Sequence, residues 1–222
     1  MATGYKIGYI DEDENQVKKY QRRFREFGFE IIGYEFHQGM TLNQLMSQVY
    51  ESDIDLLMID YKLNETNQVT FNGEAVESEF YDKRPLFPHI IFTNKVEQAE
   101  PHVEDWKIIF DKNEIFSDEE EDGKKVQHFI TTLEKSIEQY RKYVERRKEI
   151  VADLLEKGQK EELSASDKDL LVTNQNELAY LDQTERNEIP SHLITESKLK
   201  DLSRTKKEAE EFLQSLIEKR KE

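Results

Sequence analysis

The feature that most constrains this chain is a regular alternation of short apolar runs with segments of helical spacing. Five runs of apolar or β-branched residues have the length and composition of buried strands: 5–10, 29–34, 54–59, 89–92 and 106–110. Three segments between them carry apolar residues three or four positions apart, as amphipathic helices do: 15–27, 41–51 and 73–81. This alternation predicts an α/β fold, a doubly wound five-stranded parallel sheet with helices on both faces.

The sequence changes character after Gly123, where long amphipathic helices replace the alternation. The first is predicted to continue through Leu154 and to end near Gly158. A second is predicted to start at the capping sequence 164–167, and Pro190 separates it from a third, at 199–217. These helices indicate an α-helical extension, either an antiparallel bundle or a coiled coil that dimerises, with packing between its own helices as the simpler expectation. The predicted domains are therefore 1–136 and 137–222.

Composition narrows the class of partner. The 222-residue chain has 32 basic and 48 acidic residues and a formal net charge of −16, which repels nucleic-acid phosphates. We therefore expect protein partners and no direct nucleic-acid binding. The chain has no cysteine, which excludes disulfides and cysteine-ligated zinc. No apolar stretch approaches the roughly 20 residues that span a bilayer, and no signal peptide precedes the first predicted strand, so we expect a cytoplasmic protein without membrane contact.

Residues suited to phosphoryl chemistry follow four of the predicted strands. Asp11 and Glu12 follow the first strand, and Asp60, Thr93 and Lys112 follow the third, fourth and fifth. Because open parallel sheets bind ligands at the carboxyl ends of their strands, we expect these side chains to meet there. Asp11, Glu12 and Asp60 supply the hard oxygen ligands that Mg²⁺ prefers. Asp60 could attack phosphorus as a carboxylate nucleophile, while Lys112 and Thr93 could bind the phosphoryl oxygens.

This ordered set resembles the receiver domain of bacterial two-component response regulators, over the α/β part of the chain and not over the extension. The resemblance implies a flavodoxin-like fold in which Asp60 is the phosphoacceptor, with Thr93 and Lys112 beside it. It also implies Mg²⁺ held by Glu12, Asp60, the backbone carbonyl of Lys62 and, through water, Asp11. The implied partners are a sensor histidine kinase or a phosphotransfer protein as phosphodonor, as in a phosphorelay, and a downstream effector protein.

Several positions depart from the pattern of that family. Asn113 follows Lys112 where the family has a proline, and Ile109 stands where it has an aromatic switch residue. Pro101 interrupts the short stretch between the fourth and fifth strands, so the helix there should be short or distorted.

Two residues beside the predicted phosphoryl site are larger than those often found there in the family. These residues are Asn94 and Lys62. We hypothesise that they restrict the attack of water and prolong the phosphorylated state.

Three functions remain open from the sequence. The first is a response-regulator-like protein that signals through protein contacts of its helical extension, to an effector or between two protomers of a homodimer. The second is a pseudo-receiver that is never phosphorylated and serves as an interaction or scaffold module. The third is a magnesium-dependent phosphohydrolase, which would carry an acidic residue two positions after its nucleophile, where this chain has Lys62.

Overall fold

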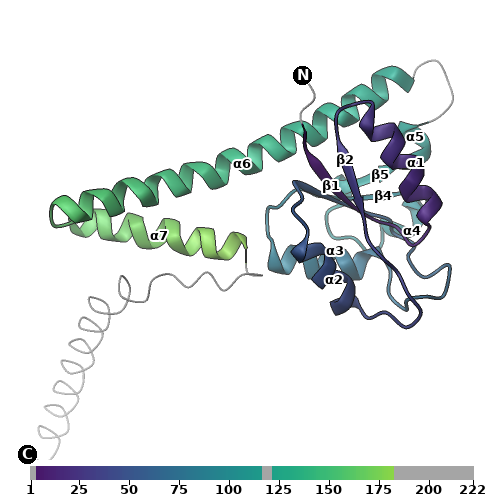
Figure 1. Cartoon of the computed structure of the whole chain (residues 1–222), viewed down its shortest axis with the longest axis horizontal. Coiled ribbons are helices and arrows are strands. Elements are labelled where there is room, and N and C mark those ends of the chain that lie inside the picture. The colour runs from purple at the N-terminus through teal and green to yellow at the C-terminus, as the bar shows by residue number, and fades with distance from the viewer. Residues whose placement is uncertain (1–3, 117–121, 183–222) are drawn as a thin grey trace, which may run out of the picture. The chain divides into compact units, whose positions relative to one another are not determined.

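The computed structural model describes residues 4–116 and 122–182 and contains a five-stranded parallel sheet (Figure 1). The strands are β1 (Lys6–Ile10), β2 (Glu30–Gly33), β3 (Leu56–Ile59), β4 (His89–Thr93) and β5 (Ile109–Asp111). Their order in the sheet is β2-β1-β3-β4-β5, and every neighbouring pair is parallel. This is the strand order of the flavodoxin-like doubly wound folds, so the predicted fold class is confirmed.

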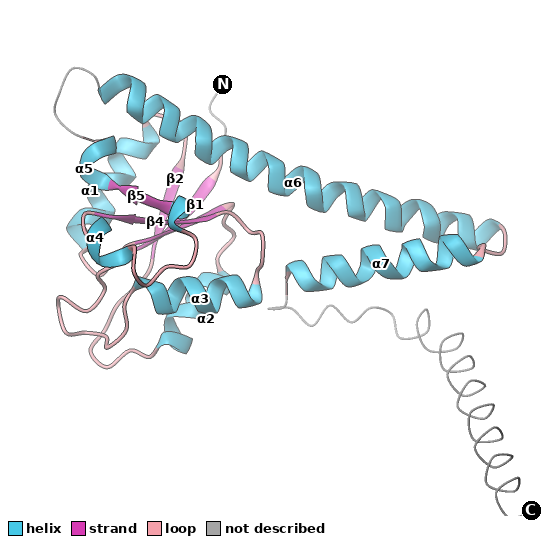
Figure 2. Ribbon diagram, turned by 180° about the vertical axis from the view of Figure 1, so that it is seen from behind, coloured by secondary structure: helices cyan, strands magenta, loops and turns pink. Residues whose placement is uncertain are grey.

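Helices cover both faces of the sheet and bury a separate apolar cluster on each (Figure 2). The elements that connect the strands are α1 (Glu14–Arg25), α2 (Leu42–Glu51), α3 (Gly73–Lys83), α4 (Val96–Ala99), the 3-10 turn η1 (Trp106–Ile108) and α5 (Lys112–Ile115). Residues of α1 and α5 belong to the cluster on one face, and residues of α2, α3 and α4 to the cluster on the other. The four-residue α4 agrees with the short fourth helix expected from the sequence.

The central strand β3 is an uninterrupted run of apolar residues, because helices cover it on both faces of the sheet. All four of its residues are fully buried. Successive side chains of a strand point to opposite faces, so Leu56 and Met58 enter one cluster while Leu57 and Ile59 enter the other. A strand with helices on both sides therefore has no position for a polar residue until it ends.

The start of α3 is held close to the end of β3 by a glycine. The backbone N–H of Gly73 donates to the carbonyl oxygen of Tyr61 at 2.7 Å. A Cβ atom at position 73 would lie 2.3 Å from the carbonyl oxygen of Asp60, so no other residue fits without a backbone shift. This contact fixes the loop that follows Asp60 against the edge of the sheet.

The fifth predicted strand is shorter than expected. Residues 106–108 form the turn η1, in which the Asp105 side chain accepts a hydrogen bond from the backbone N–H of Lys107. Trp106 is 67% exposed, so it contributes little to the core. The cap at Asp105 favours a turn, and β5 is an edge strand that pairs only with β4, so pairing does not extend the strand backwards.

The extension begins with α6 (Asp122–Lys160), whose first turns are part of the α/β core. Phe129, Ile130, Leu133 and Ile137 are almost fully buried in the same cluster as α1. The predicted domain boundary between 136 and 137 therefore falls inside one continuous helix, and the division into two domains stays a prediction.

The end of α6 and its connection to α7 (Ala165–Leu181) agree with the sequence. The helix ends at Lys160, two residues after Gly158, near which the end was predicted; a single glycine costs a long helix only about 1 kcal/mol, so the helix continues through it. α7 starts as predicted, with a capping box between Ser164 and Asp167. Ion pairs Arg147–Glu177 and Lys157–Asp167 join the two helices.

A further contact ties the end of α7 to the α/β part of the chain. Asp182, which follows the last residue of α7, pairs with Arg84 at the end of α3 at 3.3 Å. The helix predicted at 199–217 lies outside the described residues, and so does most of the acidic run 118–122. Among the described helices, none combines the length and the apolar composition that crossing a membrane requires.

We predict that Phe129→Ala lowers the free energy of unfolding by about 3–5 kcal/mol, because the ring is buried and stacks on Phe92 with 5.6 Å between centroids. The neighbouring control, His128→Ala, changes an exposed side chain of the same helix and should cost less than about 0.5 kcal/mol. Urea unfolding of the full chain measures both. Equal midpoints for the two variants would mean that α6 does not belong to the core.

Candidate functional site

All six residues singled out in the sequence line one cavity of about 130 Å³ at the carboxyl edge of the sheet. They are Asp11, Glu12, Asp60, Lys62, Thr93 and Lys112. β1, β3, β4 and β5 are consecutive in the sheet, so the residues that follow them are brought together by strand order alone. The expected meeting of these side chains is therefore observed, while their chemical roles stay predictions.

The centre of the cavity is an ion-pair triad formed by Lys112, Asp60 and Asp11. The Lys112 Nζ atom lies 2.6 Å from Asp60 Oδ1 and 3.0 Å from Asp11 Oδ2. None of the three residues is more than 8% exposed. Burial by itself would lower the pKa of Lys112, but the charges of Asp60 and Asp11 outweigh it and raise that pKa above its ordinary value. Lys112 is therefore held as a cation.

Aromatic rings complete the surroundings of the Lys112 ammonium group. Its Nζ atom lies 5.4, 5.9 and 5.6 Å from the ring centroids of Tyr9, Tyr20 and Phe92, within cation–π distance. The Tyr9 hydroxyl donates to Asp11 Oδ2 at 2.5 Å, so this carboxylate oxygen accepts from both Tyr9 and Lys112. Sequence reasoning missed Tyr9, although its place two residues before Asp11 puts both side chains on the same face of the strand.

Backbone donors hold the remaining oxygens of the two buried carboxylates. Asp60 Oδ2 accepts from the backbone N–H of Lys62 at 2.7 Å, and Asp11 Oδ1 accepts from that of Asp13 at 3.0 Å. Burial raises the pKa of Asp60, and the charge of Asp11 adds to this, while Lys112 opposes both. Asp60 is thus a carboxylate whose two oxygens are oriented by hydrogen bonds, one from Lys112 and one from the backbone of Lys62.

Negative charge exceeds positive charge in the cavity. Glu12 is half-buried, and this burial, together with the charges of Asp11 and Asp60, raises the pKa of Glu12 to about 7. Five carboxyl groups line the cavity against three ammonium groups, an imbalance that a divalent cation would relieve.

The donor set fits Mg²⁺ in the form in which proteins usually hold it, with one or two carboxylates, water and other oxygen ligands. No cluster of three or more histidine, cysteine, aspartate or glutamate side chains within residues 4–116 and 122–182 is arranged to hold a metal by itself. The backbone carbonyl of Lys62 and water would have to complete the coordination. The metal-binding roles of Glu12, Asp60, Lys62 and Asp11 therefore stay predictions.

The loops that follow β3 and β4 both contribute residues to the lining of the cavity. The fully buried Thr93 accepts a hydrogen bond from the backbone N–H of Lys95 at 3.1 Å, which leaves its hydroxyl proton free to be donated. The Lys95 ammonium group lies 4.0 Å from a Glu65 carboxylate oxygen, so an exposed ion pair joins the two loops. Nothing in the sequence pattern indicated this pair. Asn94 lines the same cavity, as expected.

Comparisons with known proteins bear on the fold alone. No protein-family model matches the sequence, and no curated protein sequence does. Among solved structures, the chain is similar to a response regulator protein of Thermotoga maritima in complex with Mg²⁺ and BeF, with 16% identity over 56% of this chain and 97% of that one and a TM-score of 0.40. It is also similar to a signal receiver domain of an HD domain-containing protein from Pseudomonas fluorescens Pf-5, with 13% identity over 66% and 96% and a TM-score of 0.47.

A third similar structure is a response regulator receiver domain protein from Methanospirillum hungatei JF-1. It is 16% identical over 60% of this chain and 98% of that one, with a TM-score of 0.40. The strand order β2-β1-β3-β4-β5 of the chain itself assigns its α/β part to the flavodoxin-like doubly wound folds.

We predict that Tyr9→Phe lowers the free energy of unfolding by about 1.5–3 kcal/mol, because it removes a buried hydrogen bond to a charged carboxylate and keeps the ring. The matched control is Tyr5→Phe, since the Tyr5 hydroxyl has no hydrogen bond to any residue that the structure describes, and its change should be within about 0.5 kcal/mol. Urea unfolding measures both. The same loss in the two variants would argue against a structural role for the Tyr9 hydroxyl.

Proposed function

We propose that this chain is a response-regulator-like signalling protein that accepts a phosphoryl group on Asp60 and signals through protein contacts of its helical extension. The observation that carries this proposal is the buried Lys112 ammonium group, 2.6 Å from Asp60 and 3.0 Å from Asp11 in a cavity at the carboxyl edge of the sheet. A buried cation beside an oriented carboxylate can stabilise the charge that a phosphoryl group brings.

The proposed reaction is a phosphoryl transfer to a carboxylate. One oxygen of Asp60 attacks the phosphorus atom of the donor and forms the new phosphorus–oxygen bond of an acyl phosphate. The bond between phosphorus and the leaving atom of the donor breaks, and the leaving group keeps that electron pair and takes a proton from water. A phosphohistidine of a sensor kinase or of a phosphotransfer protein is the donor that such a site would use.

Lys112 and Thr93 have complementary parts in this step. Once Asp60 has become an acyl phosphate, its carboxyl group no longer carries a full negative charge, so the Lys112 ammonium group can move to a phosphoryl oxygen. Asp11 stays satisfied when this happens, because the Tyr9 hydroxyl and the backbone of Asp13 still donate to it. The Thr93 hydroxyl can donate to a second phosphoryl oxygen.

Bound Mg²⁺ would offset the charge of the phosphoryl oxygens, and Glu12, Asp60, the carbonyl of Lys62 and, through water, Asp11 are the groups that would hold it. The phosphoryl donor and a downstream effector are the proposed protein partners. Dimerisation through the extension is an alternative output, and cytoplasmic localisation follows from the proposed class of donor.

A second candidate function is a pseudo-receiver scaffold, and one observation favours it. Both carboxylate oxygens of Asp60 already have hydrogen-bond donors, one from Lys112 and one from the backbone of Lys62. The triad could therefore persist as a structural ion pair that is never phosphorylated. A hydrolase has no comparable support, because the position two residues after Asp60 carries the Lys62 side chain instead of an acid.

We predict a phosphoryl adduct on the wild-type chain after incubation with Mg²⁺ and acetyl phosphate, detected as an increase in intact mass. Asp60→Asn should abolish the adduct, because an amide is not a nucleophile toward phosphorus. Asp53→Asn, which changes an exposed carboxylate, is the control and should keep it. An adduct absent from the wild type, or retained in Asp60→Asn, would contradict the proposal and favour the scaffold.

We predict that Asn94→Ala and Lys62→Ala each accelerate loss of the phosphoryl group several-fold, because both side chains line the cavity and limit the approach of water. Asn113→Ala, at an exposed position outside the cavity lining, should decay at the wild-type rate. The decay is followed by intact mass after removal of the phosphodonor. Unchanged rates in both cavity variants would contradict the shielding role.

A further inference from the structure

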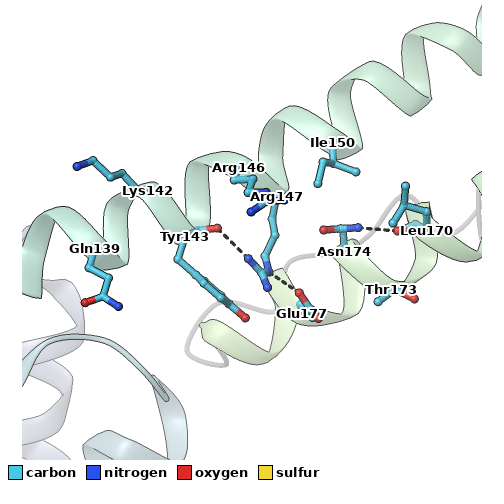
Figure 3. Close-up of a pocket in the computed structure, with 10 residues that line it drawn as sticks. All are labelled: Gln139, Lys142, Tyr143, Arg146, Arg147, Ile150, Leu170, Thr173, Asn174 and Glu177. Carbon is cyan, nitrogen blue, oxygen red and sulfur yellow. Dashed lines mark hydrogen bonds and ion pairs between the residues drawn. The ribbon is translucent and has the colours of Figure 1, made fainter.

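The two helices of the extension form a groove along their shared side (Figure 3). Its volume is about 570 Å³, and the residues that line it recur every three or four positions on each helix, so each helix contributes one face. The lining includes Lys142, Tyr143, Arg146, Arg147 and Ile150 of α6 together with Leu170 and Glu177 of α7. Two antiparallel helices with such a groove leave room for a third helix, as in helical bundles.

The floor of the groove is fixed by contacts within the hairpin. Arg147 donates to Glu177 across the two helices and to the Tyr143 carbonyl oxygen at 3.2 Å. Its guanidinium group also lies over the Tyr143 ring, 3.3 Å from the centroid. The Arg147 side chain is only 16% exposed, so this platform is ordered without a partner, which lowers the entropic cost of binding.

The groove continues into a second cavity of about 310 Å³, since Gln139 and Tyr143 line both. Five large apolar side chains are exposed among the residues that the structure describes, and three of them border these two cavities: Tyr81, Leu86 and Leu170. Exposed apolar side chains that gather along a groove are typical of protein-binding sites. Leu86 also has a positive φ of 65°, a strained conformation for a leucine.

The dimensions suit a helix. The α6 residues that line the two cavities extend from Ser136 to Ile150, which corresponds to roughly 21 Å at 1.5 Å per residue. A partner helix of about four turns has this length, and it would lay its apolar face into the groove in the helix-in-groove mode of peptide recognition.

The charge of the groove is opposite to that of the chain. Lys142, Arg146 and Arg147 line the larger cavity with Glu177 as the one acidic residue, whereas the whole chain has a formal net charge of −16. The Lys142 side chain is 79% exposed and pairs with Glu138 of the same helix at 3.5 Å, and Arg147 pairs with Glu177. The exposed Arg146 has no ion pair to any residue that the structure describes, so it is the cation of the groove best placed for an acidic partner. Acidic residues on the flanks of a partner helix would be attracted here and repelled elsewhere on the surface.

We propose that the groove between α6 and α7 binds an acidic amphipathic helix of a partner protein. A second copy of this chain fits less well, because a two-fold symmetric contact would place the cations of one groove against those of the other. The helix predicted at 199–217 of the chain itself also fits less well, because its four basic residues balance its four acidic residues. Nucleic acid fits less well because of the net charge of −16. The inference deepens the proposed function, since it names the chemistry of the effector, but peptide binding does not require phosphorylation of Asp60.

The test is a titration of a fluorescein-labelled synthetic peptide with the full chain at physiological salt, followed by anisotropy. The probe is a helix of about four turns with leucines at i, i+3, i+4 and i+7 and glutamates on the other positions. A peptide with lysine in place of glutamate and a single-stranded oligonucleotide are the comparison probes. We expect saturable binding of the acidic peptide and no binding of the two comparison probes. The Asp60→Asn chain should bind the acidic peptide with the same affinity as the wild type. The groove proposal and the phosphorylation proposal can therefore be contradicted independently of each other.

Matched charge reversals locate the binding site. Arg146→Glu should weaken peptide binding at least about tenfold, which corresponds to 1.4 kcal/mol. Lys148→Glu makes the same change in net charge, but Lys148 lies about 200° round α6 from Arg146, so it should leave the affinity unchanged. Leu86→Ser tests the apolar end and should also weaken binding. Thermal unfolding by circular dichroism verifies that each variant is folded.

Four results would overturn the proposal. The first is that the wild type does not bind the acidic peptide, and the second is that Arg146→Glu and Lys148→Glu weaken peptide binding equally. The third is that the wild type binds the oligonucleotide and that Arg146→Glu abolishes this binding. The fourth is that the chain self-associates in analytical ultracentrifugation and that this self-association depends on Arg146.

Discussion

The Lys112 ammonium group is buried between two carboxylates and three aromatic rings, which come from several elements of the α/β part. A buried cation is tolerated only when its charge is paired, and removal of one partner leaves an uncompensated charge that costs several kcal/mol. Asp11 and Asp60 therefore depend on Lys112 as much as it depends on them. Since the three residues follow β1, β3 and β5, the ion pairs also require the strand order and register of the sheet.

The ring cluster beneath Lys112 links this site to the helical extension. Phe92 contacts the ammonium group from one side and stacks on Phe129 of α6 on the other. Phe116, just before the start of α6 along the chain, packs against both rings. The first turns of α6 are consequently part of the core that supports the site, and the same helix continues outward to line the groove it shares with α7.

The cavity at the sheet edge and the groove between α6 and α7 differ in burial and in charge. The cavity at the sheet edge is lined by five carboxyl groups and three ammonium groups and so attracts positive charge. Burial, together with the charges of Asp11 and Asp60, raises the pKa of Glu12 there to about 7. The groove of the extension instead carries three cations and one carboxylate on an otherwise acidic chain. One helix thus connects the site proposed to bind a cation and a phosphoryl group with the surface proposed to bind an acidic partner.

The sequence by itself determined the order of the elements and the residues that meet at the sheet edge, because strand and helix periodicity, caps and strand ends are local properties. Asp11, Glu12, Asp60, Thr93 and Lys112 could be identified in this way. Only the tertiary structure decided that the Tyr9 hydroxyl and three rings surround Lys112, that Trp106 lies in an exposed turn, and that the first turns of α6 belong to the α/β core. These features depend on contacts between residues that are far apart in the sequence; Lys112 and Asp11, for example, are 101 positions apart. Local sequence patterns do not predict such contacts.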